Sequence, residues 1–157
     1  MVNLVDYIDP NGNWIINLIK TPNGEVLKTS SKWRSDEWYL EQTVFKTGGK
    51  VYEFGGGAFS NIQILKEKFK YDEITQIKDF DGTIDWFSFL DADLAVELLS
   101  KLDFHKTKIK YACIAFKPVR EVDFKINKEN LVKLMENNFH FIKQNRTEFL
   151  FKNKDCK

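Results

Sequence analysis

One feature of this sequence constrains its fold more than any other: apolar residues recur at steps of three and four between positions 87 and 102. The stripe comprises Phe87, Leu90, Leu94, Leu98 and Leu102, and Ala95 and Leu99 widen it. Steps of this size place side chains on one face of an α-helix, and such a face is buried in a globular protein. The sequence therefore predicts a central helix here, with Asp85 or Ser88 as its N-terminal cap.

Three pairs of β-forming runs flank segments rich in turn residues, which indicates β-hairpins. The first pair, residues 14–19 and 25–30, surrounds Thr21-Pro22-Asn23-Gly24. The second hairpin is expected from Trp38 to Phe54, with its turn at Gly48-Gly49. The third joins residues 139–142 to residues 148–151 and closes the chain.

Four further elements follow from local patterns. Residues 108–117 are apolar on both faces, as in an interior strand covered on both sides. Val122, Phe124 and Ile126 alternate with charged residues, as in a half-exposed strand. We also expect a short helix within residues 62–71, capped by Ser60 or Asn61, and a second one over residues 128–137, capped by Asn127.

Adjacent strands joined by short turns imply antiparallel pairing, and helices that arrive between groups of hairpins imply an α+β arrangement. We therefore predict an α+β fold with a mainly antiparallel sheet built from β-hairpins and two or three helices packed on it. A chain of 157 residues suits one domain, and we predict that residues 1–157 form it. The 15% aromatic content predicts a core built largely of rings.

The composition excludes several classes of protein. A hydrophobic content of 43% is typical of a globular chain and argues against disorder. No basic segment followed by an apolar run opens the chain, and no apolar run approaches the roughly 20 residues that cross a bilayer. Cys113 and Cys156 do not suggest a disulfide framework. We therefore expect a cytoplasmic protein without a membrane partner.

Charge is distributed unequally along the chain. Residues 1–100 hold 10 basic and 16 acidic side chains, whereas residues 101–157 hold 14 and 7. The acidic side chains of the first hundred residues are concentrated within residues 72–97. Carboxylates near a helix N-terminus interact favourably with the helix dipole, so a solvated helix start explains this cluster. An acidic docking face for a basic partner explains it as well.

The segment Asp79-Phe80-Asp81-Gly82-Thr83 resembles the DxDGT motif of the haloacid dehalogenase-like phosphatases. The resemblance implies that Asp79 attacks a phosphate ester and that Asp81 serves as acid and base. That fold requires the motif at the end of a buried parallel strand, and the preceding Ile74-Thr75-Gln76-Ile77-Lys78 is a weak strand. We retain phosphate-ester hydrolysis as a second alternative only.

The same region is similar to part of a calmodulin-like EF-hand loop. With Gly82 at the glycine position, Asp79, Asp81 and Asp85 fall on ligand positions, but Ile77 and Ser88 replace the first ligand and the bidentate carboxylate. Ca²⁺ takes six to eight oxygen ligands, so three carboxylates do not suffice. We predict no metal site.

Gly55-Gly56-Gly57 is the only glycine-rich run in the sequence. Glycine lets backbone N–H groups converge on an anion. The segment does not fit GxGxxG, however, and it lacks the Lys-Ser/Thr pair of a P-loop. A structural turn and an anion site both remain open for it.

No set of side chains suited to nucleophilic catalysis emerges. His105 and His140 lack metal-ligand spacing to each other or to a cysteine, and Cys113 lies in the predicted interior strand. Without a Ser-His-Asp or Cys-His set, we predict no catalytic residues, no cofactor and no enzymatic activity.

The basic segment 106–128 interleaves lysines with Tyr111 and Phe124, as a nucleic-acid-binding face would. The isoelectric point near 7.7 is lower than such modules usually show. Nucleic-acid binding by this face is the first alternative function.

The leading hypothesis is a non-enzymatic, stoichiometric inhibitor that binds another protein, such as a bacterial toxin-immunity protein or a phage-encoded inhibitor. Its acidic surface would neutralise a basic partner, for example a toxin nuclease. Tryptophans dominate interface hot spots and supply candidate anchors. The predicted partner-binding residues are Asp79, Asp81, Asp85, Asp91, Asp93, Trp33, Trp38 and Trp86.

Overall fold

The computed structural model describes residues 17–29, 31, 33–55, 60–115, 121–145 and 147–156 of the chain. Within these ranges it contains eight strands and four helices. In chain order they are β1 (Asn17–Lys20), β2 (Val26–Thr29), α1 (Ser35–Gln42), β3 (Gly49–Phe54), α2 (Gln63–Lys68), β4 (Tyr71–Glu73), β5 (Gly82–Phe89), α3 (Ala92–Lys101), β6 (Thr107–Ala115), α4 (Glu121–Met135), β7 (Phe139–Asn145) and β8 (Glu148–Asn153).

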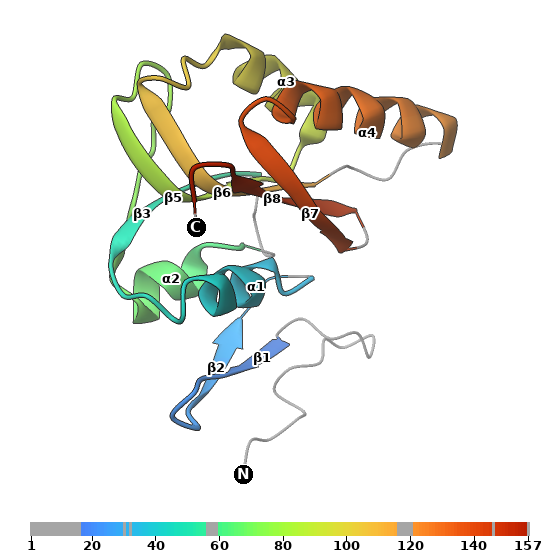
Figure 1. Ribbon diagram of the computed structural model, residues 1–157. Coiled ribbons are helices and arrows are strands. Elements are labelled where there is room, and N and C mark those ends of the chain that lie inside the picture. Colours follow the sequence, from blue (N-terminus) through green and yellow to red (C-terminus); the bar gives the residue numbers. More distant parts are fainter. Residues whose placement is uncertain are drawn as a thin grey trace.

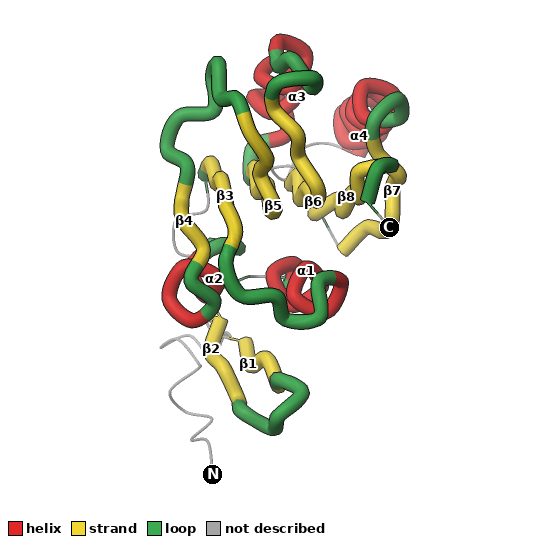
Figure 2. The backbone as a smooth tube through the Cα atoms, turned by 60° about the vertical axis from the view of Figure 1, so that its left-hand side comes forward, coloured by secondary structure: helices red, strands yellow, loops and turns green. Residues whose placement is uncertain are grey.

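Six of these strands form one mixed sheet in the order β4-β3-β5-β6-β8-β7 (Figure 2). The first four strands are parallel, whereas β8 runs antiparallel to both β6 and β7. The remaining strands, β1 and β2, form a separate antiparallel pair. The expectation of a mainly antiparallel sheet is therefore wrong: the protein is an α/β structure with a parallel core and an antiparallel hairpin at one side.

Helices cover both faces of the sheet, α1 and α2 on one face and α3 and α4 on the other (Figure 1). Neighbouring residues of β5 point to opposite faces: Trp86 packs with α1 and α2, whereas Phe87 packs with α3 and α4. Both side chains are completely buried. A parallel strand covered on both faces is apolar on both, as expected. The interior strand predicted at residues 108–117 is confirmed over residues 108–115, which belong to β6, while residues 116 and 117 lie outside the described residues.

The apolar stripe between residues 87 and 102 contains two elements. Phe87 belongs to β5, and the helix begins only at Ala92. Asp91 caps this helix, because its Oδ1 accepts a hydrogen bond from the backbone N–H of Leu94 at 3.4 Å. Asp85 and Ser88 lie inside β5 and cap nothing. The steps from Phe87 to Leu94 satisfy a helix period by coincidence, since a buried strand is apolar at nearly every position.

The second predicted hairpin, from Trp38 to Phe54, is also wrong. Residues 38–40 lie in α1, and only β3 at the end of this segment is a strand. The aromatic residues here favour a strand by intrinsic propensity. Tertiary packing overrides that preference, because α1 buries Trp38, Tyr39 and Leu40 against the sheet.

The predicted strand at residues 122–126 is helical instead and belongs to α4, so Asn127 lies inside a helix and does not begin one. Positions 124, 131 and 135 also follow helical spacing, and Leu131 and Met135 are buried. Other local predictions are confirmed: the β1–β2 hairpin, the short helix α2 and the closing β7–β8 hairpin. Ser60 Oγ accepts hydrogen bonds from the backbone N–H groups of Ile62 and Gln63 at 3.2 and 3.1 Å.

We predict that Trp86→Ala lowers the free energy of unfolding by about 3–5 kcal/mol, because it leaves a large cavity in the core. It also removes the hydrogen bond from Nε1 to the Asn61 carbonyl at 3.1 Å. Phe141→Ala, at an exposed position of β7, serves as control and is expected to lose less than half as much. Urea unfolding measures both. A Trp86→Ala protein that loses less than about 1 kcal/mol contradicts the buried position of this ring.

Candidate functional site

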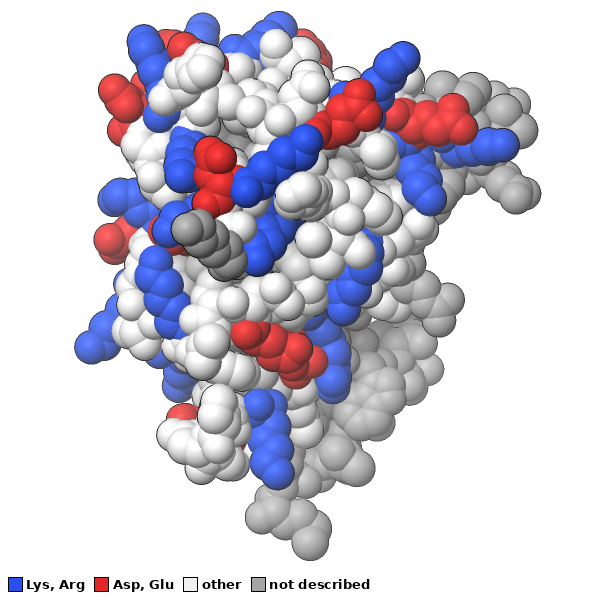
Figure 3. Space-filling view, in the orientation of Figure 1, with Lys and Arg blue, Asp and Glu red and all other residues white. Residues whose placement is uncertain are grey.

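Of the five aspartates proposed as one acidic face, the four whose side chains the structure describes do not lie together. Asp79 and Asp81 are exposed just before the amino end of β5, whereas Asp91 follows its carboxyl end. A strand of this length spans roughly 26 Å. Asp85 is buried within the strand, and the side chain of Asp93 lies outside the described residues. On the face shown in Figure 3, acidic side chains alternate with basic ones.

Two of the three proposed tryptophan anchors are core residues. Trp86 is completely buried and Trp38 is 6% exposed. Trp33 is half-buried, and its carbonyl accepts a hydrogen bond from Asn145 Nδ2 at 3.4 Å. The inhibitor hypothesis stays a prediction, but the structure brings neither its aspartates nor its tryptophans together on one surface.

The segment that resembles a phosphatase motif precedes β5. That motif requires the carboxyl end of a buried parallel strand, but Asp79 and Asp81 lie at the amino end of one. Asp79 also has a positive φ of 60°, which is typical of a turn. Phosphate-ester hydrolysis through this pair therefore lacks its structural context.

Within the described ranges, no three His, Cys, Asp or Glu side chains gather as metal ligands would. Nor does any helix there combine the length and apolar composition that crossing a membrane requires. Of the glycine-rich run, Gly56 and Gly57 lie outside the described residues, and the anion site suggested for it stays a prediction.

A row of polar side chains crosses the parallel strands near their carboxyl ends. Glu53 of β3 pairs in register with Ser88 of β5, and Ser88 pairs with Cys113 of β6. Ser88 and Cys113 are completely buried, while Glu53 is partly exposed. Because parallel strands end at the same edge of the sheet, three residues distant in sequence form one polar row on the α1 and α2 side.

Asn61 connects the members of this row. Its Nδ2 donates to Ser88 Oγ at 3.1 Å and lies 3.7 Å from Cys113 Sγ, while its backbone N–H donates to Glu53 Oε2 at 2.6 Å. Its Oδ1 accepts a hydrogen bond from Ser31 Oγ. Asn61 is completely buried, so each of these bonds replaces one to water that folding removes.

Two further buried carboxyl groups adjoin this cluster from α1 and β8. Glu148 accepts a hydrogen bond from Ser35 Oγ, and Asp36 accepts one from Thr29 Oγ1 and another from the backbone N–H of Glu37 at 2.8 Å. Both carboxyl groups are at most 3% exposed. The region therefore holds three carboxyl groups and one thiol beneath the carboxyl edge of the sheet.

Burial sets the protonation of this cluster. Desolvation raises the pKa of Glu53 and of Glu148, although hydrogen bonds from Ser60 and Ser35 oppose the shift. It raises the pKa of Asp36 to about 7. The pKa of the Cys113 thiol is raised well above its usual range by burial and by the nearby Glu148 charge. A neutral, enclosed thiol is a poor nucleophile, so the cluster is suited to hydrogen bonding and not to covalent catalysis.

The chain changes direction across the sheet at β3 and β5. From β3 the chain passes through α2 to β4, which lies on one side of β3 in the sheet. It then crosses to β5, on the other side of β3, and continues in that direction through α3 to β6. The two strands stay paired to their ends, where the backbone N–H of Leu90 donates to the carbonyl of Phe54 at 2.9 Å. In open α/β sheets such a switch point forms a crevice at the carboxyl ends of the strands.

The sequence indicated a possible anion site at Gly55-Gly56-Gly57, but not that the preceding strand ends at a switch point. In the sequence this run directly follows β3 and precedes α2 by a few residues. A glycine-rich segment between a strand and a helix is typical of nucleotide-binding βαβ units. The prediction of a hairpin at Gly48-Gly49 concealed it, because that hairpin made β3 antiparallel.

No protein-family model matches the chain, and neither does any curated protein sequence. Solved structures with some similarity include M. capricolum TrmK in complex with S-adenosyl-homocysteine, at 11% identity, 74% coverage of this chain, 67% coverage of that chain and a TM-score of 0.34. Another is a putative RNA methyltransferase from Pyrococcus horikoshii, at 15% identity, 77% and 82% coverage and a TM-score of 0.36. At these values, neither similarity supports an inference about what this protein does.

Asp36 predicts a specific pH dependence of stability. Its pKa rises from an ordinary value of 3.8 to about 7 on folding, so the folded protein holds this proton more tightly than the unfolded chain does. The resulting stabilisation is complete below about pH 4 and is lost as the pH rises through 7. Between pH 5 and pH 8 we expect wild type to lose about 2–3 kcal/mol more unfolding free energy than Asp36→Asn.

Urea unfolding of the two proteins at matched pH values measures this difference. Asparagine retains the shape of the protonated acid, so the variant controls for the titration of all other groups. Parallel pH profiles for wild type and Asp36→Asn would show that Asp36 does not hold its proton in the folded state.

Proposed function

We propose that this protein binds a nucleoside-containing ligand at the carboxyl ends of β3 and β5. The observation that carries the proposal is the reversal of strand order between these two parallel strands. Ligands in open α/β sheets bind outside the carboxyl ends of the strands at such a switch point. The proposal rests on this architecture and on the residues that surround it.

The backbone at the end of β3 suits a close approach by a ligand. Gly55 has a φ of +79°, a conformation that glycine adopts without strain. A Cβ at this position would lie 3.7 Å from Leu90, which is an ordinary contact. The backbone conformation, and not the available space, therefore favours glycine here, as in the tight first turn of nucleotide-binding units.

One acidic residue, at the end of the strand next to β3, is the candidate partner for the hydroxyl groups of such a ligand. Glu73 is the last residue of β4, the strand next to β3, and its carboxylate is exposed and paired with Lys66. An acidic side chain about 20 residues after the glycine segment binds ribose hydroxyls in dinucleotide-binding folds. Glu73 follows Gly55 at a comparable separation, so we assign to Glu73 the role of binding the ribose hydroxyls.

A thermal-shift measurement with NAD⁺, ATP and S-adenosyl-homocysteine, each at millimolar concentration, tests the proposal. A ligand that binds only the folded protein raises its melting temperature. We expect at least one of the three to do so, and Glu73→Gln to weaken its binding about tenfold through the lost ribose contact.

Glu67→Gln is the matched control, because Glu67 is an exposed α2 residue near Glu73 in the chain. It should bind the same ligand as wild type does. Three ligands without effect, or a ligand whose amide chemical-shift changes avoid Gly55, Glu73 and Leu90, would refute the proposed site.

A further inference from the structure

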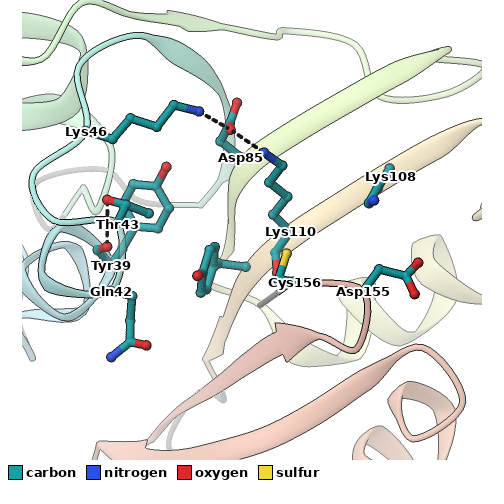
Figure 4. A pocket seen from close by; sticks show the side chains of 10 residues that line it. Tyr39, Gln42, Thr43, Lys46, Asp85, Lys108, Lys110, Asp155 and Cys156 are labelled. Carbon is teal, nitrogen blue, oxygen red and sulfur yellow. Dashed lines mark hydrogen bonds and ion pairs between the residues drawn. The ribbon is translucent and has the colours of Figure 1, made fainter.

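A second polar cavity lies on the α1 side of the sheet, away from the carboxyl ends of the strands. It has a volume of about 450 Å³ and is lined by residues of α1, the segment between α1 and β3, β5, β6 and the segment after β8 (Figure 4). Its charged lining residues are Lys46, Lys108, Lys110, Asp85 and Asp155. The cavity combines lysines from distant parts of the chain. The nucleoside-ligand proposal does not use these lysines.

Asp85 holds two of these lysines in place. Its Oδ1 lies 3.0 Å from Lys46 Nζ and 3.6 Å from Lys110 Nζ, and its Oδ2 accepts a hydrogen bond from the Lys50 backbone N–H at 2.9 Å. The Asp85 side chain is only 10% exposed, whereas those of Lys46 and Lys110 are 44% and 37% exposed. The carboxylate is thus recessed, and a molecule that enters the cavity meets the ammonium groups first.

Lys108 adds a third ammonium group from the same strand as Lys110. Residues two apart in a strand project to the same face, and both side chains line the cavity. Among the described residues, Lys108 has no ion-pair partner within 4 Å. An ammonium group carries three N–H donors and no acceptor, so the cavity has more donors than its own carboxylates occupy.

The wall between these lysines and α1 is aromatic. The rings of Tyr39 and Tyr111 meet edge to face with centroids 5.5 Å apart. Lys152 Nζ lies 5.9 Å from the Tyr111 centroid, which adds positive charge nearby. The ammonium groups favour an anion with several acceptor oxygens, and the two tyrosine rings form a wall beside them.

We propose that this cavity binds a phosphate group, either as a free phosphate or as part of a nucleic-acid backbone. The tetrahedral oxygens of a phosphate accept hydrogen bonds from several directions, which suits Lys46, Lys108 and Lys110 together. Asp85 is a positioning residue that holds two of the donors. The proposal stands on this cavity alone and is independent of the nucleoside site at the carboxyl end of β5.

Cys156 provides a local readout because it lines the cavity, whereas Cys113 is completely buried. Alkylation of the folded protein by iodoacetamide therefore reports on Cys156. One arm titrates pyrophosphate and a second titrates a 12-nucleotide single-stranded RNA, each at several fixed ionic strengths set by chloride. We expect saturable protection of Cys156 in at least one arm.

Lys108→Gln should weaken that protection by about three- to tenfold, because it removes one ammonium group without breaking an ion pair. Lys125→Gln, at an exposed position of α4 that does not line the cavity, should bind as wild type does. Asp155→Asn removes a negative charge from the lining and should strengthen binding about twofold. Asp155→Asn tests the cavity even if Lys108→Gln does not fold.

The two arms separate the sources of the phosphate. Protection by pyrophosphate at concentrations similar to those of RNA indicates a free phosphate ligand. If RNA protects Cys156 at concentrations at least tenfold lower than pyrophosphate does, the ligand is a nucleic-acid backbone. In that case Lys108→Gln should reduce the salt dependence of RNA binding by about one released ion. Absence of protection in both arms, or protection that neither Lys108→Gln nor Asp155→Asn alters, overturns the proposal.

Discussion

The parallel pairing of β5 with β3 and β6 is the constraint on which the rest of the structure depends. A strand with parallel neighbours on both sides needs crossover connections, and these place α2 on one face of the sheet and α3 on the other. β5 must therefore be apolar on both faces, as its adjacent residues Trp86 and Phe87 are. The hydrophobic effect then fixes the strand in the centre of the protein.

The same pairing gives the two ends of the sheet different chemistry. At the carboxyl ends, strand register aligns Glu53, Ser88 and Cys113 beneath the switch point, and Asn61 connects them. Nearer the amino ends, Asp85 draws Lys46 and Lys110 together. Each buried polar group needs a partner because an unpaired one costs more than its bond contributes. The polar clusters are therefore consequences of the fold as well as candidate sites.

Some elements were predictable because their signals are local. The turn around Pro22 and Gly24, the alternation in the closing hairpin and the apolar run of β6 each depend on a few adjacent residues. The parallel core was not predictable in this way. β5 and α3 share a continuous apolar pattern from Phe87 to Leu102, and only the long-range pairing of Trp86 with Val51 and Tyr111 separates the strand from the helix.

The candidate sites were less predictable than the fold. Glu53 and Cys113 are far apart in the sequence, and nothing local indicates that they share a polar row. Asp85 was visible as one member of an acidic segment, yet its ion pairs are with Lys46 and Lys110, which the fold brings to it. The polar row has no sequence pattern of its own, because it exists only after strands pair in register. The basic segment 106–128 indicated Lys108 and Lys110, but not that Lys46 and Asp85 join them in one cavity.

Strand direction in the core tests this account most directly, and nuclear Overhauser effects between β5 and β6 measure it. Parallel strands bring the α-protons of one strand close to the amide protons of the other, whereas antiparallel strands bring α-protons close to one another. We predict α-proton to amide contacts around Trp86 and Tyr111, and none between the α-protons of the two strands. Strong contacts between α-protons of β5 and β6 would contradict the parallel core, and with it both proposed sites.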